Sequence, residues 1–339
     1  MRQRVTRLSV LLVLGAALAA AEDRFAVLEF FGRPSGTYCS AAGPAMTALQ
    51  HEFAGRAVLL EYDYDLFPYG RQDRFWATGV SAYYLPLVMV GSGFRTSSGS
   101  ADYERVYRSM LEAELARAPR AGVRAYWRRQ GSALRAYVSL TNPGPSDILV
   151  NRDAGIWVIA YERDATAGVG ETWVQSTALW YLPHDLEPGQ GLSAIIDTPA
   201  VGGLDWERMA GLVLVDDRPA GGAYDMLQAA EALPADLYLA PERPVVGARG
   251  GTATLELAGP HVLSWTAASD VPWLVIEPSS GTLPATVSVE LRPELRPAAA
   301  TEGTISFAAS GDGMSFSTTT TVTVGAPLRR GNRRIAPTP

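Results

Sequence analysis

The run Phe30-Phe31-Gly32-Arg33-Pro34-Ser35-Gly36-Thr37-Tyr38-Cys39-Ser40-Ala41-Ala42-Gly43-Pro44-Ala45-Met46 carries the only cysteine of the chain. The apolar residues that lead into it predict a strand, and the alanines that follow predict a helix. A cysteine at such a junction is a candidate redox residue. Dithiol exchange needs two sulfurs, however, because one thiolate attacks and the second resolves the mixed disulfide. We therefore expect a strand–helix scaffold that has no redox couple.

The composition indicates a folded, exported protein. Of the 339 residues, 47% are hydrophobic and 19% are charged, which suits two or three domains with buried cores. The net charge of −6 gives no support to nucleic-acid binding. Residues 1–21 combine a cationic start, an apolar run and an Ala-x-Ala end, which predicts a cleaved signal peptide and a secreted or periplasmic location. No later apolar run is long enough to span a membrane.

Residues 24–118 alternate strand-like and helix-like stretches. The predicted strands are 24–32, 56–65 and 87–90, and the predicted helices are 41–53, 71–78 and 102–115. In the last of these helices the apolar residues recur at helical spacing. This order of elements predicts an α/β domain.

A resemblance to a known family makes this prediction more specific. Tyr84-Leu85-Pro86-Leu87-Val88-Met89-Val90-Gly91 resembles the cis-proline strand of thioredoxin-like proteins, which implies a cis bond before Pro86. Together with Tyr69-Gly70-Arg71 and Arg74-Phe75-Trp76, the segment resembles secreted thioredoxin-fold proteins of the outer-membrane-protein-28 family. The resemblance covers residues 24–118. It implies that Cys39 is the remnant of a Cys-x-x-Cys pair.

Cys39 aligns with such a pair in two ways. If Cys39 is the attacking sulfur, Ala42 replaces the resolving cysteine; if it is the resolving sulfur, Gly36 replaces the attacker. The spacing to Pro44 favours the second alignment, in which the sulfur is partly buried and away from the helix N-terminus. An inert packed thiol is the favoured interpretation. A reactive monothiol and an intermolecular disulfide stay open as alternatives.

Residues 121–236 carry short apolar or alternating runs, with turn residues such as Asn142-Pro143-Gly144-Pro145 between them. This pattern predicts a β-sandwich domain. The alanine-rich stretch 223–232 is expected to form a terminal helix. Residues 206–230 also resemble the second half of the same secreted family.

Residues 237–325 include a stretch, 262–282, that closely resembles the BACON domain, an immunoglobulin-like sandwich of secreted bacterial proteins. Because that family carries an expectation of carbohydrate binding, Trp265 and Trp273 are candidate sugar-stacking residues. The competing interpretation, which we favour, places them in the core of a small sandwich. Residues 326–339, with arginines between prolines, predict a disordered basic tail.

Other chemistry receives little support. Glu61, Asp63 and Asp65 alternate near the end of a strand, but no calcium-loop pattern follows, so a solvated strand end is the favoured interpretation. The three histidines lie in different segments: His51, His184 and His261. No zincin, serine-hydrolase, Walker or dinucleotide motif is present. We expect neither a cofactor nor a metal.

These features predict a three-domain, non-enzymatic protein with a binding or structural role at the cell envelope or outside the cell. The BACON-like module would contact a glycan or an envelope protein. The alternative is a thiol–disulfide oxidoreductase that works through Cys39 alone with an external thiol.

Overall fold

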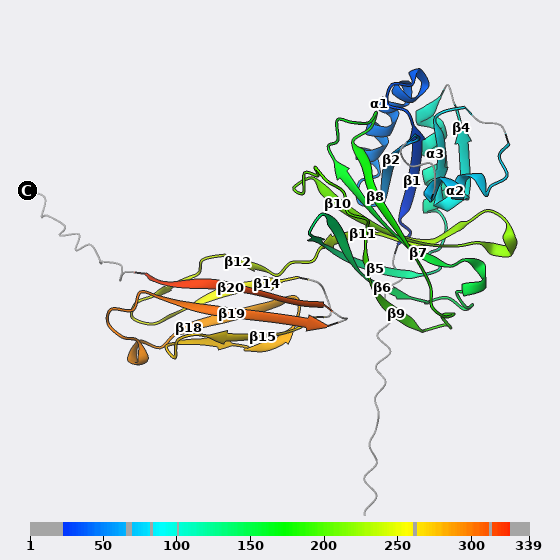
Figure 1. Ribbon diagram of the computed structural model, residues 1–339. Coiled ribbons are helices and arrows are strands. Elements are labelled where there is room, and N and C mark those ends of the chain that lie inside the picture. The colour runs from blue at the N-terminus through cyan, green and yellow to red at the C-terminus, as the bar shows by residue number, and fades with distance from the viewer. Residues whose placement is uncertain are drawn as a thin grey trace, which may run out of the picture.

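The computed structural model describes residues 23–65, 70–81, 84–99, 102–259, 263–311 and 314–325. A large sheet with helices occupies the chain up to Pro234, and a β-sandwich follows it (Figure 1). The predicted signal peptide and the predicted tail lie outside the described residues. Within the described ranges, no helix is long and apolar enough to cross a membrane.

The predicted strands and helices of residues 24–118 build one end of the large sheet. Its strands are β1 (Ala26–Gly32), β2 (Ala57–Asp63), β3 (Leu87–Val90) and β4 (Arg95–Ser98), and its helices are α1 (Thr37–Glu52), α2 (Arg71–Trp76) and α3 (Tyr103–Leu115). β1 pairs in parallel with β2 and antiparallel with β3. Every residue of β1 is buried, which explains its nearly continuous apolar sequence. The polar edge strand β4 is an element that the sequence pattern did not predict.

The sheet continues into residues 121–236, in the order β4-β3-β1-β2-β8-β7-β10-β11-β5-β6-β9. The added strands are β5 (Gly122–Gln130), β6 (Ala133–Thr141), β7 (Gly155–Arg163), β8 (Thr172–Tyr181), β9 (Gly191–Asp197), β10 (Met209–Asp217) and β11 (Asp225–Pro234). β2 meets β8 through the parallel pair Glu61↔Trp173. The structure therefore differs from the expectation of a sandwich domain with sheets of its own.

The far part of this sheet curls over itself. Ile156 and Val158 of β7 share one core with Val138 and Leu140 of β6. The alternating runs thus enclose a core between two layers, although hydrogen bonds link those layers into one sheet. This curling accounts for the sandwich-like sequence pattern of residues 121–236.

The predicted helix over 223–232 is wrong, because this stretch forms β11. β11 pairs antiparallel with β10 along most of its length and buries Met226, Leu227 and Ala229. Alanine favours a helix in isolation, but its intrinsic preference is weak and tertiary packing overrides it. Here the neighbouring strands supply both the hydrogen bonds and the burial.

Buried charges join the two halves of the sheet. Arg71, at the start of α2, is 1% exposed, and its partners Glu29 on β1 and Asp216 on β10 are fully buried. The Arg71 guanidinium donates to Glu29 Oε1 and to Asp216 Oδ2, each at 2.7 Å. Two carboxylates from distant segments thus converge on one cation.

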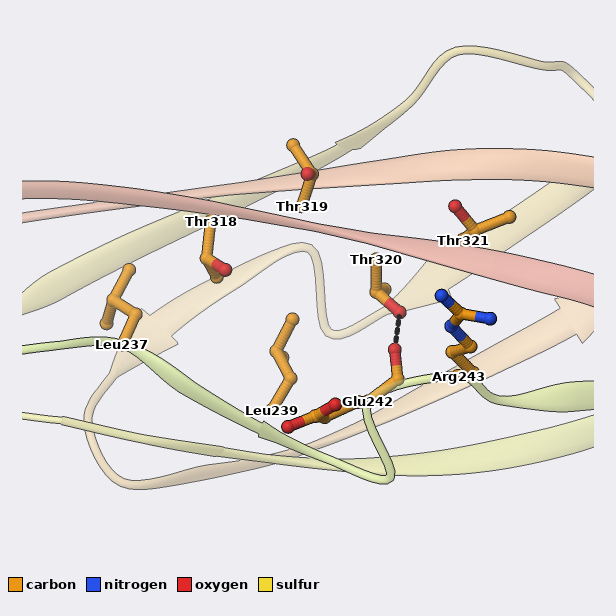
Figure 2. Close-up of a pocket in the computed structure, with 8 residues that line it drawn as sticks. All are labelled: Leu237, Leu239, Glu242, Arg243, Thr318, Thr319, Thr320 and Thr321. Carbon is orange, nitrogen blue, oxygen red and sulfur yellow. Dashed lines mark hydrogen bonds between the residues drawn. The ribbon is translucent and has the colours of Figure 1, made fainter.

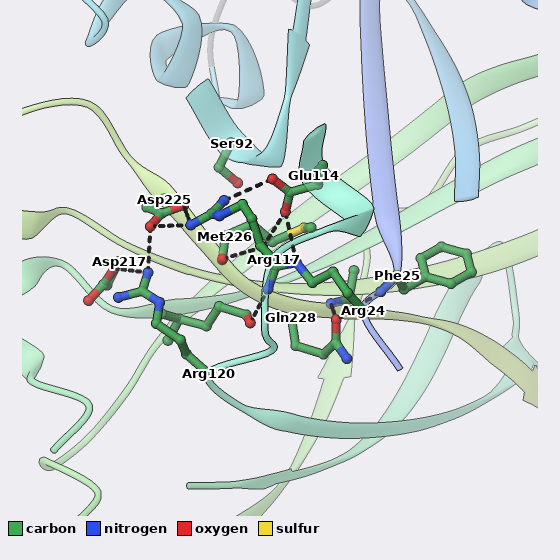
Figure 3. A network of polar contacts seen from close by, with 12 residues as sticks. Arg24, Phe25, Ser92, Glu114, Arg117, Arg120, Asp217, Asp225, Met226 and Gln228 are labelled. Atoms are coloured by element: carbon green, nitrogen blue, oxygen red, sulfur yellow. Dashed lines mark hydrogen bonds and ion pairs between the residues drawn. The ribbon is translucent and has the colours of Figure 1, made fainter. Parts of the chain in front are cut away.

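A second network lies near the C-terminal end of α3 (Figure 3). Glu114 is fully buried and accepts hydrogen bonds from Arg24 Nε and Arg117 Nη1, each at 2.8 Å. Arg117 and Arg120 in turn donate to Asp225 of β11, at 2.7 and 2.8 Å. These contacts hold α3 and the start of β1 against β11.

The C-terminal part consists of a four-stranded sheet, β12-β14-β18-β16, and a five-stranded sheet, β13-β20-β19-β15-β17. The strands are β12 (Tyr238–Ala240), β13 (Val245–Gly247), β14 (Gly251–Ala258), β15 (Ser264–Ser269), β16 (Leu274–Glu277), β17 (Ser280–Thr282), β18 (Ala285–Leu291), β19 (Glu302–Gly311) and β20 (Met314–Gly325). Residues of both sheets share one core, so this part is a β-sandwich. Tyr126 and Tyr137 of the large sheet join that core and seat the sandwich against it.

Candidate functional site

Cys39 lies in the first turn of α1 with 1% of its surface exposed. Its sulfur accepts a hydrogen bond from the backbone N–H of Arg33 at 3.4 Å. Burial raises the pKa of the thiol, and the Arg33 contact only partly opposes this. A buried thiol with a raised pKa is a poor nucleophile, because the thiolate is the reactive form.

The positions that would hold a second thiol carry none. Gly36 precedes α1 and Ala42 lies one turn inside it. The expected burial of Cys39 is confirmed, but its expected distance from the helix N-terminus is wrong, because α1 begins at Thr37 and places Cys39 in its first turn. The Leu85–Pro86 bond is cis, as predicted.

The alternating carboxylates of β2 do not converge on a common point. Glu61 is fully buried and accepts hydrogen bonds from the N–H groups of Val169 and Gly170, at 2.8 and 2.9 Å. Asp65 is exposed and pairs with Arg33, with two N–O distances of 2.8 Å. The expectation of a solvated strand end is therefore wrong for Glu61, whose carboxylate fastens the β7–β8 loop to β2.

The histidines do not gather into a site either. His51 Nε2 lies 3.2 Å from Glu171 Oε1, and His184 Nδ1 lies 2.8 Å from the Asp185 carbonyl oxygen. His261 lies outside the described residues. Among the residues that the structure describes, no group of three or more His, Cys, Asp or Glu side chains could hold a metal ion.

The structure confirms the favoured core position of Trp265 and Trp273 and rules out their candidate role as sugar-stacking residues. Their exposed fractions are 1% and 2%, and both belong to the sandwich core. A Cβ atom at Gly303 would lie 3.1 Å from the Trp273 ring, which shows how closely the core encloses it. Neither indole face is accessible to a ligand.

A groove on the sandwich was not predicted. It has a volume of about 370 Å³ and lies between the segment that contains β12 and the strand β20 (Figure 2). Its lining residues are Leu237, Leu239, Glu242, Arg243, Thr318, Thr319, Thr320 and Thr321. Thr318 and Thr320 point toward the β12 segment, and the Thr320 hydroxyl donates to the Glu242 carbonyl oxygen at 2.6 Å.

A second hollow of about 530 Å³ adjoins this groove at the junction with the large sheet. It is lined by Arg128, Asp236, Leu237 and residues 315–318, so the two hollows share Leu237 and Thr318. We call the two together the trough. It follows β20 from Ser315 to Thr321 and is flanked at its junction end by Arg128 of β5.

A smaller cleft of about 180 Å³ lies between α1, β7 and β11. Most of its ionisable groups already bond to each other. Tyr161 donates to Glu231 Oε1 at 2.5 Å, Arg163 donates to the same oxygen at 3.0 Å, and His51 pairs with Glu171. Because these groups have protein partners, the cleft offers less to a ligand than the trough does.

One feature of the β20 sequence indicates a binding edge. Residues 315–321 contain no charged residue and no proline, although they lie in a long strand. Natural edge strands are usually protected by charges, prolines or bulges. An unprotected hydroxyl-rich strand is therefore a reason to look for a partner at its edge.

Comparisons with known proteins give distant similarities only. No family model matches the chain, and no curated protein matches it. A crystal structure of an Agrobacterium tumefaciens protein is similar at 19% identity, with a TM-score of 0.42 over 63% of this chain and 96% of that one. A Bacteroides ovatus GH5 xyloglucanase in complex with a heptasaccharide is similar at 18% identity, with a TM-score of 0.21 over 26% of this chain and 19% of that one. Tandem immunoglobulin domains of titin give 10% identity and a TM-score of 0.19 over 61% of this chain and 98% of the titin chain. TM-scores this low carry no argument about function.

Proposed function

We propose that this chain is an exported, non-catalytic binding protein, built on a redox-inactive thioredoxin-like scaffold followed by an immunoglobulin-like, BACON-like sandwich. Its ligand is an extended polymer, a glycan or a polypeptide, that lies in the trough. The trough is the observation that carries the proposal. It is elongated, polar along β20 and apolar at Leu237 and Leu239, which suits a chain-like ligand.

The arrangement of the first elements supports the scaffold assignment. β1, α1 and β2 form a parallel strand–helix–strand unit, and β3 and β4 add antiparallel strands in the order β4-β3-β1-β2. The proposed thioredoxin-like scaffold has the same strand order. In that scaffold a Cys-x-x-Cys pair stands at the start of the first helix, where this chain has Gly36 and Cys39.

The state of Cys39 argues for binding rather than redox catalysis. A monothiol reductase needs a sulfur that an external disulfide can reach. Cys39 is 1% exposed and burial raises its pKa, so both access and thiolate formation are disfavoured. The monothiol mechanism is the second candidate, and no observation favours it.

A trough-filling substitution tests the proposal. Thr318→Trp places an indole where the two hollows meet, and Ser306→Trp places the same group on the exposed side of the neighbouring strand β19 as a control. The mature protein is titrated with panels of soluble oligosaccharides and of peptides. We expect binding by at least one panel, lost in Thr318→Trp and kept in Ser306→Trp. Failure of both panels to bind, or binding that Thr318→Trp leaves intact, would overturn the proposal.

A further inference from the structure

The backbone of β20 has a free edge inside the trough. On one side β20 pairs with β19 in an unbroken register from Met314 to Thr323. On the other side β13 pairs with β20 only from Thr323 to Gly325. In the described part of the chain, no strand covers the outer edge of β20 between Met314 and Val322.

The direction of the backbone groups follows from two hydrogen bonds. The N–H of Thr323 donates to Pro244 on the outer side, and the N–H of Val324 donates to Thr301 on the side of β19. Because backbone groups alternate between the two edges of a strand, odd-numbered residues face outward. The N–H and C=O groups of Ser315, Ser317, Thr319 and Thr321 therefore point away from β19, along the trough.

We infer that the trough binds a peptide in extended conformation, which adds to the sheet as a new strand beside β20. This inference rests on the proposed binding function and names the class of its ligand. Four outward residues supply alternating donors and acceptors at the two-residue repeat of a strand. A polypeptide matches that repeat with its own backbone, whereas a glycan has no such repeat of amide groups.

The walls of the trough fix the extent and the chemistry of the peptide. Seven residues, 315–321, span roughly 20–24 Å at the usual rise of a strand. β13 closes the edge at Thr323, so the site ends there. Leu237 and Leu239 lie across from β20, so the peptide side chains that face them meet apolar groups, whereas those beside Glu242 and Arg243 meet charged residues.

The surroundings favour a single strand over a second copy of the sandwich. The segment 237–243 lines the trough opposite residues 318–321, and Arg128 and Asp236 line it near Ser315. A whole sheet edge would have to fit between these walls. A single strand needs only the space that the trough provides. Where this single strand faces Leu237 and Leu239, we expect β-branched or apolar residues at alternate peptide positions.

The test uses the full mature chain and a displayed library of random 12-residue peptides. Peptides enriched on the wild type are sequenced, synthesised and titrated against Thr319→Pro and Thr319→Ala. Thr319→Pro removes one outward N–H and leaves the bonds to β19, because proline is tolerated at the free side of an edge strand. Thr319→Ala changes the side chain and keeps the N–H. We expect Thr319→Pro to weaken binding at least about tenfold, since a peptide carbonyl loses its donor, and Thr319→Ala to bind within about threefold of wild type.

Amide hydrogen exchange gives a second measurement that needs no variant. Bound peptide should slow the exchange of the outward amides of Ser317 and Thr319. The amides of Thr318 and Thr320 face β19 and should change little. An absence of enriched peptides, equal binding by Thr319→Pro, or exchange that slows equally at all four amides would overturn the inference.

Two further outcomes separate this inference from the proposed function. An oligosaccharide that Thr318→Trp blocks and Thr319→Pro does not would keep the trough as a binding site and refute the peptide. A dimer in sedimentation experiments that Thr319→Pro dissociates would show that the edge pairs with a second copy. Loss of all trough-dependent binding would remove the proposed function together with the inference.

Discussion

The substitution Arg71→Met tests the buried charge cluster that links the two halves of the large sheet. Arg71 makes hydrogen bonds to Glu29, Asp216 and Ser92, and Ser92 accepts at 2.9 Å. Methionine keeps much of the side-chain volume but removes the cation. Both carboxylates lie at 0% exposure, so water cannot replace the lost partner.

The expected loss of stability depends on which buried charges the substitution leaves without a partner. Asp216 keeps a contact with the Arg74 cation, at 3.2 Å from Nε, whereas Glu29 keeps a neutral donor, the Tyr62 hydroxyl at 2.9 Å. Breaking a buried ion pair by removing one partner costs about 3–5 kcal/mol. The whole stability of a domain is about 5–15 kcal/mol. We therefore expect Arg71→Met to lower the free energy of unfolding of the large-sheet domain by about 3–5 kcal/mol, a fifth or more of the total.

The control is Arg105→Met, which removes the same charge from an exposed pair. The side chain of Arg105 is 76% exposed and that of its partner Asp102 is 54% exposed. Such surface pairs contribute about 0–1 kcal/mol. Urea unfolding, followed by circular dichroism on the full chain, compares the midpoints of the two variants with wild type.

A double variant separates lost charge balance from lost packing. Glu29→Gln with Arg71→Met removes the carboxylate that would lose its cation and leaves Asp216 paired with Arg74, so stability should recover part of the loss. The reasoning fails if Arg71→Met costs less than about 1 kcal/mol, which is the contribution of an exposed pair. It also fails if the double variant is less stable than Arg71→Met alone.

Three more outcomes are expected. Trp273→Ala should cost about 3–5 kcal/mol, as large-to-small core changes do, and a thermal melt of the sandwich that shifts by less than about 2 °C would contradict this. Cys39 should react slowly with a thiol reagent in the native protein and fast in urea, with no insulin-reduction turnover; turnover that is lost in Cys39→Ser would refute it. Burial raises the pKa of Glu61, so its contribution to stability is complete below the ordinary glutamate pKa of about 4.3 and is lost as the pH rises through the folded-state pKa. Relative to Glu61→Gln, the wild type should therefore lose stability as the pH rises above about 4.3, and a wild-type stability that stays constant or rises relative to the variant would contradict this.

The local elements of residues 24–118 were predictable because their signals are contiguous in sequence. The apolar run of β1 and the spaced apolar residues of α3 each identify an element without reference to the rest of the chain. β4 was missed because its four residues, Arg95-Thr96-Ser97-Ser98, are polar and form a strand only through pairing with β3. β11 was predicted as a helix because its alanines favour a helix in isolation. Its pairing with β10 leaves no local signal in the sequence.

The continuity of the large sheet and the position of the trough depend on contacts between distant residues. β2 and β8 meet at one pair, Glu61 and Trp173, which lie in separate predicted domains. The trough needs the segment 237–243 to lie beside β20, near the far end of the chain. No local periodicity encodes either contact. The position of Trp273, by contrast, was predictable from local sequence, because the apolar residues beside it already favoured a place in the core.

The trough takes its lining from both parts of the molecule, and the junction between them is packed. The N–H of Ala235 donates to the Trp127 carbonyl oxygen at 2.7 Å, and Leu233 pairs with Tyr126, so the chain stays attached to β5 until it enters the sandwich. The rings of Tyr137 and Phe316 meet edge to face, with centroids 6.0 Å apart. These contacts set Arg128 on β5 beside the start of β20 before any ligand arrives. Binding to a preformed groove costs less free energy, because less of the protein has to be ordered. Substitutions that loosen this junction should therefore weaken binding even where they do not contact the ligand.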